Sequence, residues 1–472
     1  MTIKEFNQGL IDRKFKIREI IAQYYERIED KDTKIGAYLS LFKEKALKKA
    51  EELSQKLEKN PSLARDNPLY GVPIAIKDNI LIEGEKATAG SKMLENYIAT
   101  YDATVIKKLK DKEVIFLGKT NLDEFAIGSS TENSAFQKTY NPLDLSLVPG
   151  GSSGGSAAAV SANMAIGALG SDTGGSIRQP ASFCGVVGLK PTYGTVSRFG
   201  GIAMASSLDQ IGPFAKNVAD TEILFDAIKG KDPLDSTSVE SKFLIFNDQF
   251  SNLKNLTIGL PKEFFNGISK EVKEAINKTI EELKGKGIKF KKISFPFLKY
   301  SLPCYYIIVP AEVSSNLARY DNIKYGKILS DNNMTLNWKE YMTKARTIGF
   351  GEEVKKRIIL GTFVLSHGYY DAYYLKASKV RRMIKDNFQE IFKEVDLILT
   401  PTSPTLPFKI GEKTKDPLSM YLSDIFTVPV NLAGLPAISI PTKKEKMVGF
   451  QLIGPAFSEN LIFKIGKLYE KP

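Results

Sequence analysis

Three short segments of the chain carry residues that could do chemistry together. Lys77 ends the uncharged run 71–76, and two loops rich in glycine and serine follow at 150–156 and 170–176. Taken singly, such a loop is usually a turn, because glycine adopts positive φ at no steric cost, and a lysine after a strand is usually solvated. Here each loop precedes a helix-compatible run, 157–163 and 177–182, and helix starts present free backbone N–H groups. The pattern therefore favours a site.

Two kinds of chemistry suit such loops. Phosphate binding is the first, but neither loop has the pattern G-x-x-x-x-G-K-S/T, and no G-x-G-x-x-G follows a strand. Nucleophilic catalysis is the second, because Ser176 follows two glycines at an expected helix start. The N–H groups of Thr173, Gly174, Gly175 and Ser176 would then converge as an oxyanion hole.

A nucleophilic serine needs a base. The only histidine is His367, in the tyrosine-rich segment 366–370, where a structural role is the simpler interpretation. Lysine is an attested alternative base. Since lysine with its reference pKa of ~10.4 is neutral in only about one molecule in 2,500 at pH 7, burial must lower the pKa of Lys77. Asp78 would raise that pKa unless its carboxylate points elsewhere.

Composition excludes several classes of protein. The chain has 472 residues, 43% hydrophobic and 25% charged, as in an ordinary globular enzyme. Two cysteines, Cys184 and Cys304, cannot form a disulfide framework or a structural zinc site, and no metal site is expected. We expect a cytoplasmic protein with no membrane association, because no run of apolar residues would span a bilayer or serve as a signal peptide. The net charge of +12 suits either a nucleic-acid partner or a basic outer surface.

Apolar periodicity predicts helices that alternate with buried strands. Helices are expected at 6–28, 37–57 and 269–283, the last with Ser269 as N-cap, and strands at 72–76, 114–117, 165–169, 186–189, 256–260, 395–399 and 437–440. This order predicts an α/β fold, a single large domain with a mixed, mostly parallel β-sheet covered by helices on both faces. We expect one domain over 1–472, comprising an N-terminal helical region 1–65, a core with the candidate loops 66–215, and a remainder 216–472 with the substrate pocket.

The two loops, the strand before Lys77, and the intervals of 75 residues from Lys77 to Ser152 and 24 from Ser152 to Ser176 resemble the amidase signature family. The resemblance implies the amidase signature fold and a Ser-Ser-Lys triad. In that triad Ser176 is the nucleophile, Ser152 the bridging serine and Lys77 the base. It also implies a cis peptide bond between Gly151 and Ser152. We further expect Asp172 and Arg178 to hold the second loop through a buried ion pair.

Later segments narrow the resemblance. Segments 305–306, 314–321, 355–362, 368–374 and 424–434 are similar to the family members that provide the glutaminase component of tRNA-dependent amidotransferases. The likeness implies that Arg357 and Asp424 bind the α-carboxylate and α-ammonium of glutamine, with Tyr306 nearby. One fixed cation and one fixed anion suit an amino-acid zwitterion. The plainer interpretation of Arg357 is a solvated residue on a helix face.

The resemblance thus implies a glutaminase subunit that hydrolyses glutamine to glutamate and ammonia. A partner B subunit, which binds tRNA and ATP with Mg²⁺, would use the ammonia to convert Glu-tRNA(Gln) to Gln-tRNA(Gln), or also Asp-tRNA(Asn) to Asn-tRNA(Asn). A small C subunit would tie the two together, and this chain would contact tRNA only through B and need no cofactor. Two alternatives stay open: a stand-alone amidase, and a noncatalytic tRNA-binding or assembly module.

Overall fold

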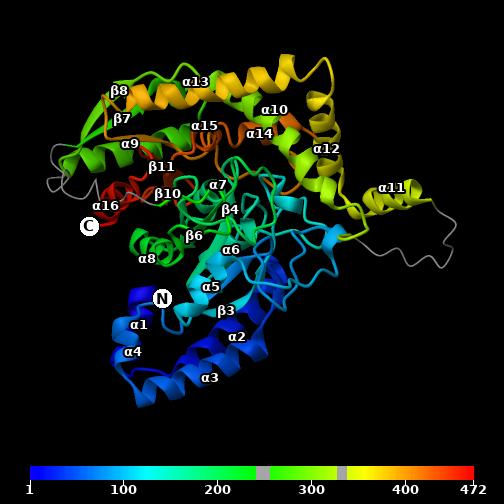
Figure 1. The fold of residues 1–472 in the computed structure, drawn as a ribbon. Helices are drawn as coiled ribbons and strands as arrows, with labels where there is room; N and C mark the ends of the chain where they lie inside the picture. Colours follow the sequence, from blue (N-terminus) through cyan, green and yellow to red (C-terminus); the bar gives the residue numbers. More distant parts are fainter. Residues whose placement is uncertain (241–255, 327–336, 472) are drawn as a thin grey trace.

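The fold is built on one eleven-stranded sheet. The computed structural model describes residues 1–240, 256–326 and 337–471. The strands lie in the order β1-β3-β2-β4-β6-β5-β10-β11-β9-β7-β8 (Figure 1). Their bounds are β1 Tyr38–Leu41, β2 Pro73–Lys77, β3 Ile115–Thr120, β4 Gly167–Asp172, β5 Val187–Lys190, β6 Gln210–Ala215, β7 Thr257–Pro261, β8 Lys289–Ile293, β9 Leu397–Pro401, β10 Ala437–Pro441 and β11 Gly449–Ile453.

The sheet is mixed, as the sequence predicted, but the expectation of a mostly parallel sheet is wrong. Of the ten pairings among the described strands, only β2–β3, β2–β4, β7–β8 and β7–β9 are parallel. The remaining six pairings, which include the whole centre of the sheet, are antiparallel. One reason is local: β10 and β11 are joined by a short turn, and only antiparallel strands can be connected that way.

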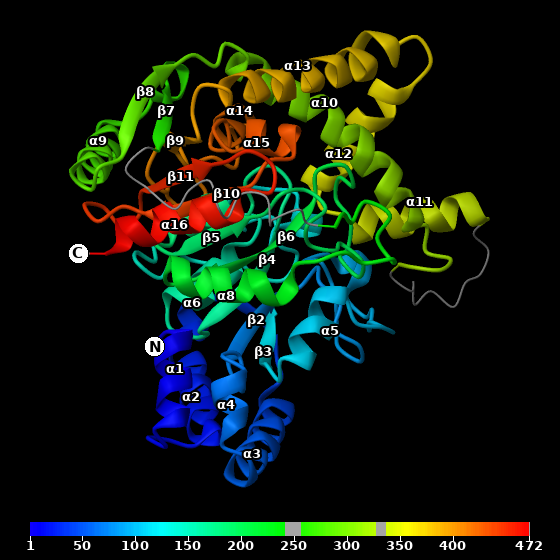
Figure 2. The ribbon, with the colours of Figure 1, turned by 60° about the vertical axis from the view of Figure 1, so that its left-hand side comes forward.

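Helices cover both faces of the sheet, which confirms that part of the prediction. Helices α8 (Val218–Ile228) and α16 (Glu459–Glu470) contact each other and lie across one face (Figure 2). Helices α6 (Gly154–Ser161) and α7 (Arg178–Phe183) pack on the other face. Within β4, Gly167 accordingly faces Leu224 of α8, whereas Gly170 faces Ser153 before α6. The strands between these layers are buried on both sides.

The other helices form two groups. The N-terminal group lies at one end of the sheet and consists of α1 Ile3–Ile11, α2 Ile17–Ile35, α3 Lys43–Lys59, α4 Ser62–Asp66 and α5 Thr104–Asp111 (Figure 1). The second group comprises α9 Lys270–Gly285, α10 Leu298–Asn316, α11 Trp338–Gly349, α12 Glu352–Leu365, α13 Lys376–Ile391, α14 Pro417–Leu422 and α15 Val428–Ala433. Across the described residues, no helix has both the length and the apolar character needed to cross a bilayer.

The N-terminal helices differ from the prediction in detail. The expected helix over 6–28 is two helices, because the chain reverses after Asp12, where Arg13 has φ +56° and Phe15 packs back against Phe6. The expected helix over 37–57 begins instead with strand β1, which adds to the edge of the sheet beside β3. Ser269, in contrast, is confirmed as an N-cap: its side chain accepts a hydrogen bond from the N–H of Val272.

Helix α12 crosses α10 at very close range. At Gly361 a Cβ atom would lie 1.8 Å from the carbonyl oxygen of Pro310 in α10. Only glycine fits there, so Gly361 sets the distance between the two helices. The glycine at the end of α9, Gly285, has no neighbour within 4 Å of the position a Cβ would take.

These two helix glycines predict opposite effects on stability. Gly361→Ala should destabilise the protein by about 1–3 kcal/mol, because the added methyl group forces α12 away from α10. Gly285→Ala should stabilise it by about 0.5–1 kcal/mol, because alanine loses less backbone entropy in a helix. Urea unfolding midpoints of both variants check this. Equal shifts would contradict the close helix crossing.

Candidate active site

Lys77 lies at the end of β2, fully buried among hydroxyl and carbonyl groups. Its Nζ is 2.8 Å from the Oγ atoms of both Ser152 and Ser153. It is also 2.9 Å from the Oγ and 3.3 Å from the carbonyl oxygen of Ser171. A serine hydroxyl can donate or accept a hydrogen bond, so this cluster satisfies the amine whether it is protonated or neutral.

The surroundings favour the neutral amine. Burial lowers the pKa of Lys77 to about 7, although the more distant charges of Asp123 and Asp172 oppose that shift. Asp78 could have reversed it, but its carboxylate is bound to Lys119, 2.9 Å away, and to the Thr88 hydroxyl. The condition that the sequence placed on Asp78 is therefore met.

The two serine loops are joined to each other next to Lys77. The peptide bond between Gly151 and Ser152 is cis, as the resemblance implied. The N–H of Ser153 donates to the carbonyl oxygen of Ser176 at 3.2 Å, which holds the loops together. Ser176 itself lines a cavity. The structure contains no direct hydrogen bond between the side chains of Ser152 and Ser176, a contact that in such enzymes often tightens only when substrate binds.

The expected oxyanion hole needs one correction. The N–H of Gly175 donates to Oδ1 of Asp172 at 2.9 Å, so this group is already used within the loop. The N–H groups of Thr173, Gly174 and Ser176 make no backbone hydrogen bond to the described residues. Gly174 also lines the cavity beside Ser176. These three N–H groups remain the candidates for binding an oxyanion.

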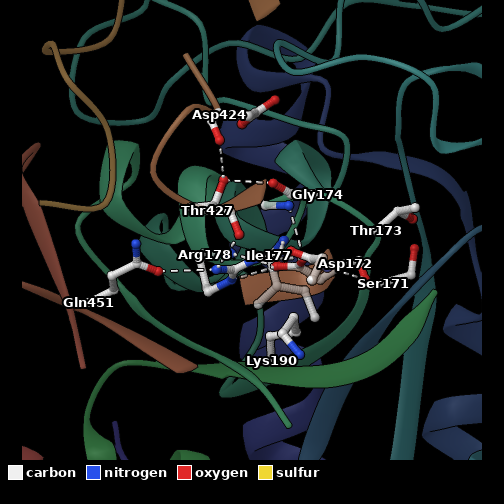
Figure 3. A network of polar contacts seen from close by, with 12 residues as sticks. Ser171, Asp172, Thr173, Gly174, Ile177, Arg178, Lys190, Asp424, Thr427 and Gln451 are labelled. Atoms are coloured by element: carbon white, nitrogen blue, oxygen red, sulfur yellow. Dashed lines mark hydrogen bonds and ion pairs between the residues drawn. The ribbon is translucent and has the colours of Figure 1, made fainter. Parts of the chain in front are cut away.

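The ion pair between Asp172 and Arg178 is confirmed, and both side chains are fully buried (Figure 3). Nε and Nη2 of Arg178 donate to the two carboxylate oxygens of Asp172 at 3.1 and 3.0 Å. Burial disfavours the carboxylate, but the guanidinium outweighs this effect and lowers the pKa of Asp172 to about 2. Arg178 also donates to Thr427 and Gln451, at 3.1 Å each, and so ties the loop to the C-terminal part of the chain.

A cavity of about 90 Å³ opens in front of Ser176. Arg357, Asp424 and Tyr306 line it together with Ser176, so the structure brings these four residues, distant in the sequence, to one site. Arg357 is only 5% exposed, which excludes the solvated-surface interpretation. Its guanidinium carbon lies 4.5 and 4.8 Å from the ring centres of Tyr306 and Tyr421, and its Nε donates to Glu353 at 2.7 Å.

Asp424 is the carboxylate with spare capacity in this cavity. Its Oδ2 accepts a hydrogen bond from the Ser129 hydroxyl, whereas its Oδ1 has no partner among the described residues. Burial raises the pKa of Asp424 to about 7. A buried acceptor without a partner is rare in native proteins, and a cationic group of a ligand would satisfy it. Where the chain is described, no group of three His, Cys, Asp or Glu side chains could hold a metal ion.

Sequence reasoning missed several residues of the site. Ser153 and Ser171 both contact Lys77 and lie in the two loops already singled out, so their position was a usable signal. Glu353, one turn before Arg357 on α12, also had a signal, because oppositely charged residues at this spacing pair on a helix. Nothing local pointed to Tyr421 or Ser129.

This arrangement is the one that a serine enzyme with a lysine base requires: a buried amine of lowered pKa, hydroxyl groups in contact with it, and free N–H groups beside a second serine. The chain belongs to the amidase family, whose model matches residues 19–463.

Similar proteins cover the whole chain. It is 54% identical to the A chain of the glutamyl-tRNA(Gln) amidotransferase of Carboxydothermus hydrogenoformans, over 100% of this chain and 97% of that protein. It is 53% identical to the protein of the same name from Persephonella marina, over 100% and 96%. The crystal structure of the corresponding Thermotoga maritima protein superposes with a TM-score of 0.80, at 44% identity over 100% and 94% of the two chains. Native peptide amidase from Stenotrophomonas maltophilia has a TM-score of 0.80 at 25% identity, over 100% and 96%.

The buried ion pair predicts a large effect on stability. Asp172→Ala should cost about 3–5 kcal/mol, because it leaves the Arg178 guanidinium buried without a counter-charge. The matched control is Arg382→Ala, which removes an exposed ion pair to Asp386 and should change stability by less than about 1 kcal/mol. Chemical denaturation measures both. A loss at Asp172 as small as that at Arg382 would show that the pair does not hold the loop.

Proposed function

We propose that this chain is the glutaminase subunit of a tRNA-dependent amidotransferase. The observation that carries the proposal is the cavity that places a fixed cation, Arg357, and an unsatisfied carboxylate, Asp424, around Ser176. Glutamine offers a group for each: its α-carboxylate for Arg357, its α-ammonium for Asp424 and its carboxamide for Ser176. The similarity to glutamyl-tRNA(Gln) amidotransferase chains at more than 50% identity over the full length supports the same substrate.

The chemistry follows from the cluster around Lys77. In the proposed mechanism neutral Lys77 accepts a proton from Ser152, which accepts one from Ser176 as its Oγ attacks the carboxamide carbon. The N–H groups of Thr173, Gly174 and Ser176 stabilise the negative charge on the carboxamide oxygen. The proton returns through Ser152 to the leaving nitrogen, ammonia departs, and water hydrolyses the glutamyl ester.

The stand-alone amidase is the second candidate, since the fold is shared with a peptide amidase. A general amide lacks at least one of the two charges of an amino-acid backbone. It would leave either Arg357 or Asp424 without a partner in the cavity. The noncatalytic module is less well supported, because it gives no reason for a buried lysine of lowered pKa in contact with three serines.

The proposal includes partners. The ammonia would pass to a B subunit that binds Glu-tRNA(Gln), or also Asp-tRNA(Asn), together with ATP and Mg²⁺, and a small C subunit would join the assembly. This chain would supply one amidase domain over its 472 residues and no cofactor site of its own. The names of its relatives designate one subunit of an amidotransferase, which supports an assembly of several chains.

Removal of the nucleophile should separate the two halves of the reaction. In the assembled complex, Ser176→Ala should abolish amidation of Glu-tRNA(Gln) supported by glutamine and leave amidation supported by ammonium chloride near the wild-type rate. The measurement is Gln-tRNA formation with each nitrogen source. Loss of both activities in a folded complex, or retention of the glutamine-dependent one, would refute the assignment of Ser176.

The two charged residues predict substrate selectivity. Arg357→Ala should lower kcat/KM for glutamine by about 2–4 kcal/mol of transition-state stabilisation, roughly 30- to 1,000-fold, because a charge-assisted contact is lost. Hydrolysis of a small amide without an α-carboxylate should change little. Asp424→Asn should behave likewise toward amides that lack the α-ammonium. If both substrates slow equally, these residues support the fold, and the case for glutamine over a general amide fails.

A further inference from the structure

The outer face of α12 and the segment after it carry an exposed apolar surface. Eight large apolar side chains between residues 359 and 375 are each 37–70% exposed. They lie on the C-terminal half of α12, on the turn that follows, and on the π-helical turn η7 (Asp371–Leu375). In Figure 1 this region forms one edge of the molecule, where α12 turns into α13. We call it the outer patch.

The outer patch is larger than isolated exposed residues would explain. At about 200 Å² for a large apolar side chain, the exposed fractions amount to about 700 Å². The largest apolar patch on a typical monomer is about 300–600 Å². A stable protein interface buries about 800 Å² on each partner. The outer patch alone therefore approaches the area of one side of such an interface.

Its aromatic side chains are already ordered against one another. The ring of Phe363 lies 4.3 Å from that of Tyr369 and 6.1 Å from that of Tyr373, centre to centre. The rings of Tyr369 and Tyr373 are 6.1 Å apart. A surface whose side chains are fixed before binding loses less conformational entropy when a partner docks.

The charge around the outer patch restricts the partner. From Val354 to Lys385 the sequence contains eight lysines and arginines and a single acidic residue, Asp371. Of these, Lys376 and Lys379 are exposed and form no ion pair with any described residue. A second copy of this chain, docked by the same patch, would face the same basic rim and be repelled. A partner with an apolar centre and an acidic rim is complementary.

The opposite face of α12 belongs to the cavity. Arg357 and Glu353 lie on that face, whereas Ile359 and Phe363 point outward from the same helix. A protein bound to the outer patch would thus hold the helix that carries the proposed carboxylate-binding arginine.

We propose that the outer patch docks another protein subunit of the same enzyme, through an apolar surface with an acidic rim. This inference rests on the proposed function, which requires such a subunit. Protein is favoured over tRNA because the exposed centre includes the aliphatic Ile359 and Leu360, whereas surfaces that bind single-stranded nucleic acid combine aromatic stacking residues with a positively charged groove.

The test measures binding of the purified chain to the purified B and C subunits encoded in the same genome. Ile359→Asp with Phe363→Ser should weaken binding at least 30-fold, since a few central apolar residues carry most of the binding energy of an interface. The matched control is Ile98→Asp with Leu145→Ser, which changes side chains of similar exposure elsewhere and should leave the affinity within 3-fold. Hydrolysis of a small amide by the isolated variants verifies that they are folded.

Each other outcome overturns the inference in an identifiable way. Unchanged binding by the folded double variant refutes the outer patch as the docking surface and leaves the proposed function intact. Failure of the wild-type chain to bind B and C refutes both. A wild-type homodimer that the double variant dissociates assigns the surface to a second copy. Loss of tRNA binding by the isolated variant, with unchanged binding to B and C, assigns it to nucleic acid.

Discussion

The site depends on one constraint: an amine is buried without a carboxylate beside it. A lysine next to Asp or Glu would keep its proton, whereas Lys77 is surrounded by hydroxyl and carbonyl oxygens, and burial lowers its pKa to about 7. Removal of its proton near neutral pH then needs little free energy. The hydroxyl groups accept either protonation state, so the amine can gain and lose a proton without leaving a buried group unsatisfied.

The surrounding carboxylates are each held away from that amine. Asp78 is bound to Lys119, and Asp172 to Arg178. Asp123 accepts the backbone N–H groups of Thr131 and Asn133. Asp424 differs, because one of its oxygens faces the cavity without a partner among the described residues. The fold therefore satisfies the charges that shape the catalytic cluster and leaves open the one that a substrate cation would complete.

The sequence carried the catalytic cluster better than the sheet. Lys77, Ser152 and Ser176 lie in short segments with strict composition, so local pattern was enough to single them out. Arg357 and Asp424 came from resemblance, because nothing local says that α12 and the segment before α15 border one cavity. Strand β8 was missed since its lysines make it mostly exposed and polar, and β6 since it contains glycine and proline. The antiparallel centre could not be predicted because strand order is set by long-range packing.

The pH dependence of hydrolysis of a small neutral amide tests the central claim most directly, because that substrate has no charged group for Asp424 or Arg357 to bind. If Lys77 must be neutral, kcat/KM should rise tenfold per pH unit below about pH 7 and level off above it, since deprotonation creates the active form. Activity that continues to rise toward pH 10, or that is independent of pH between 5 and 9, would show that Lys77 does not work as a neutral base held by burial.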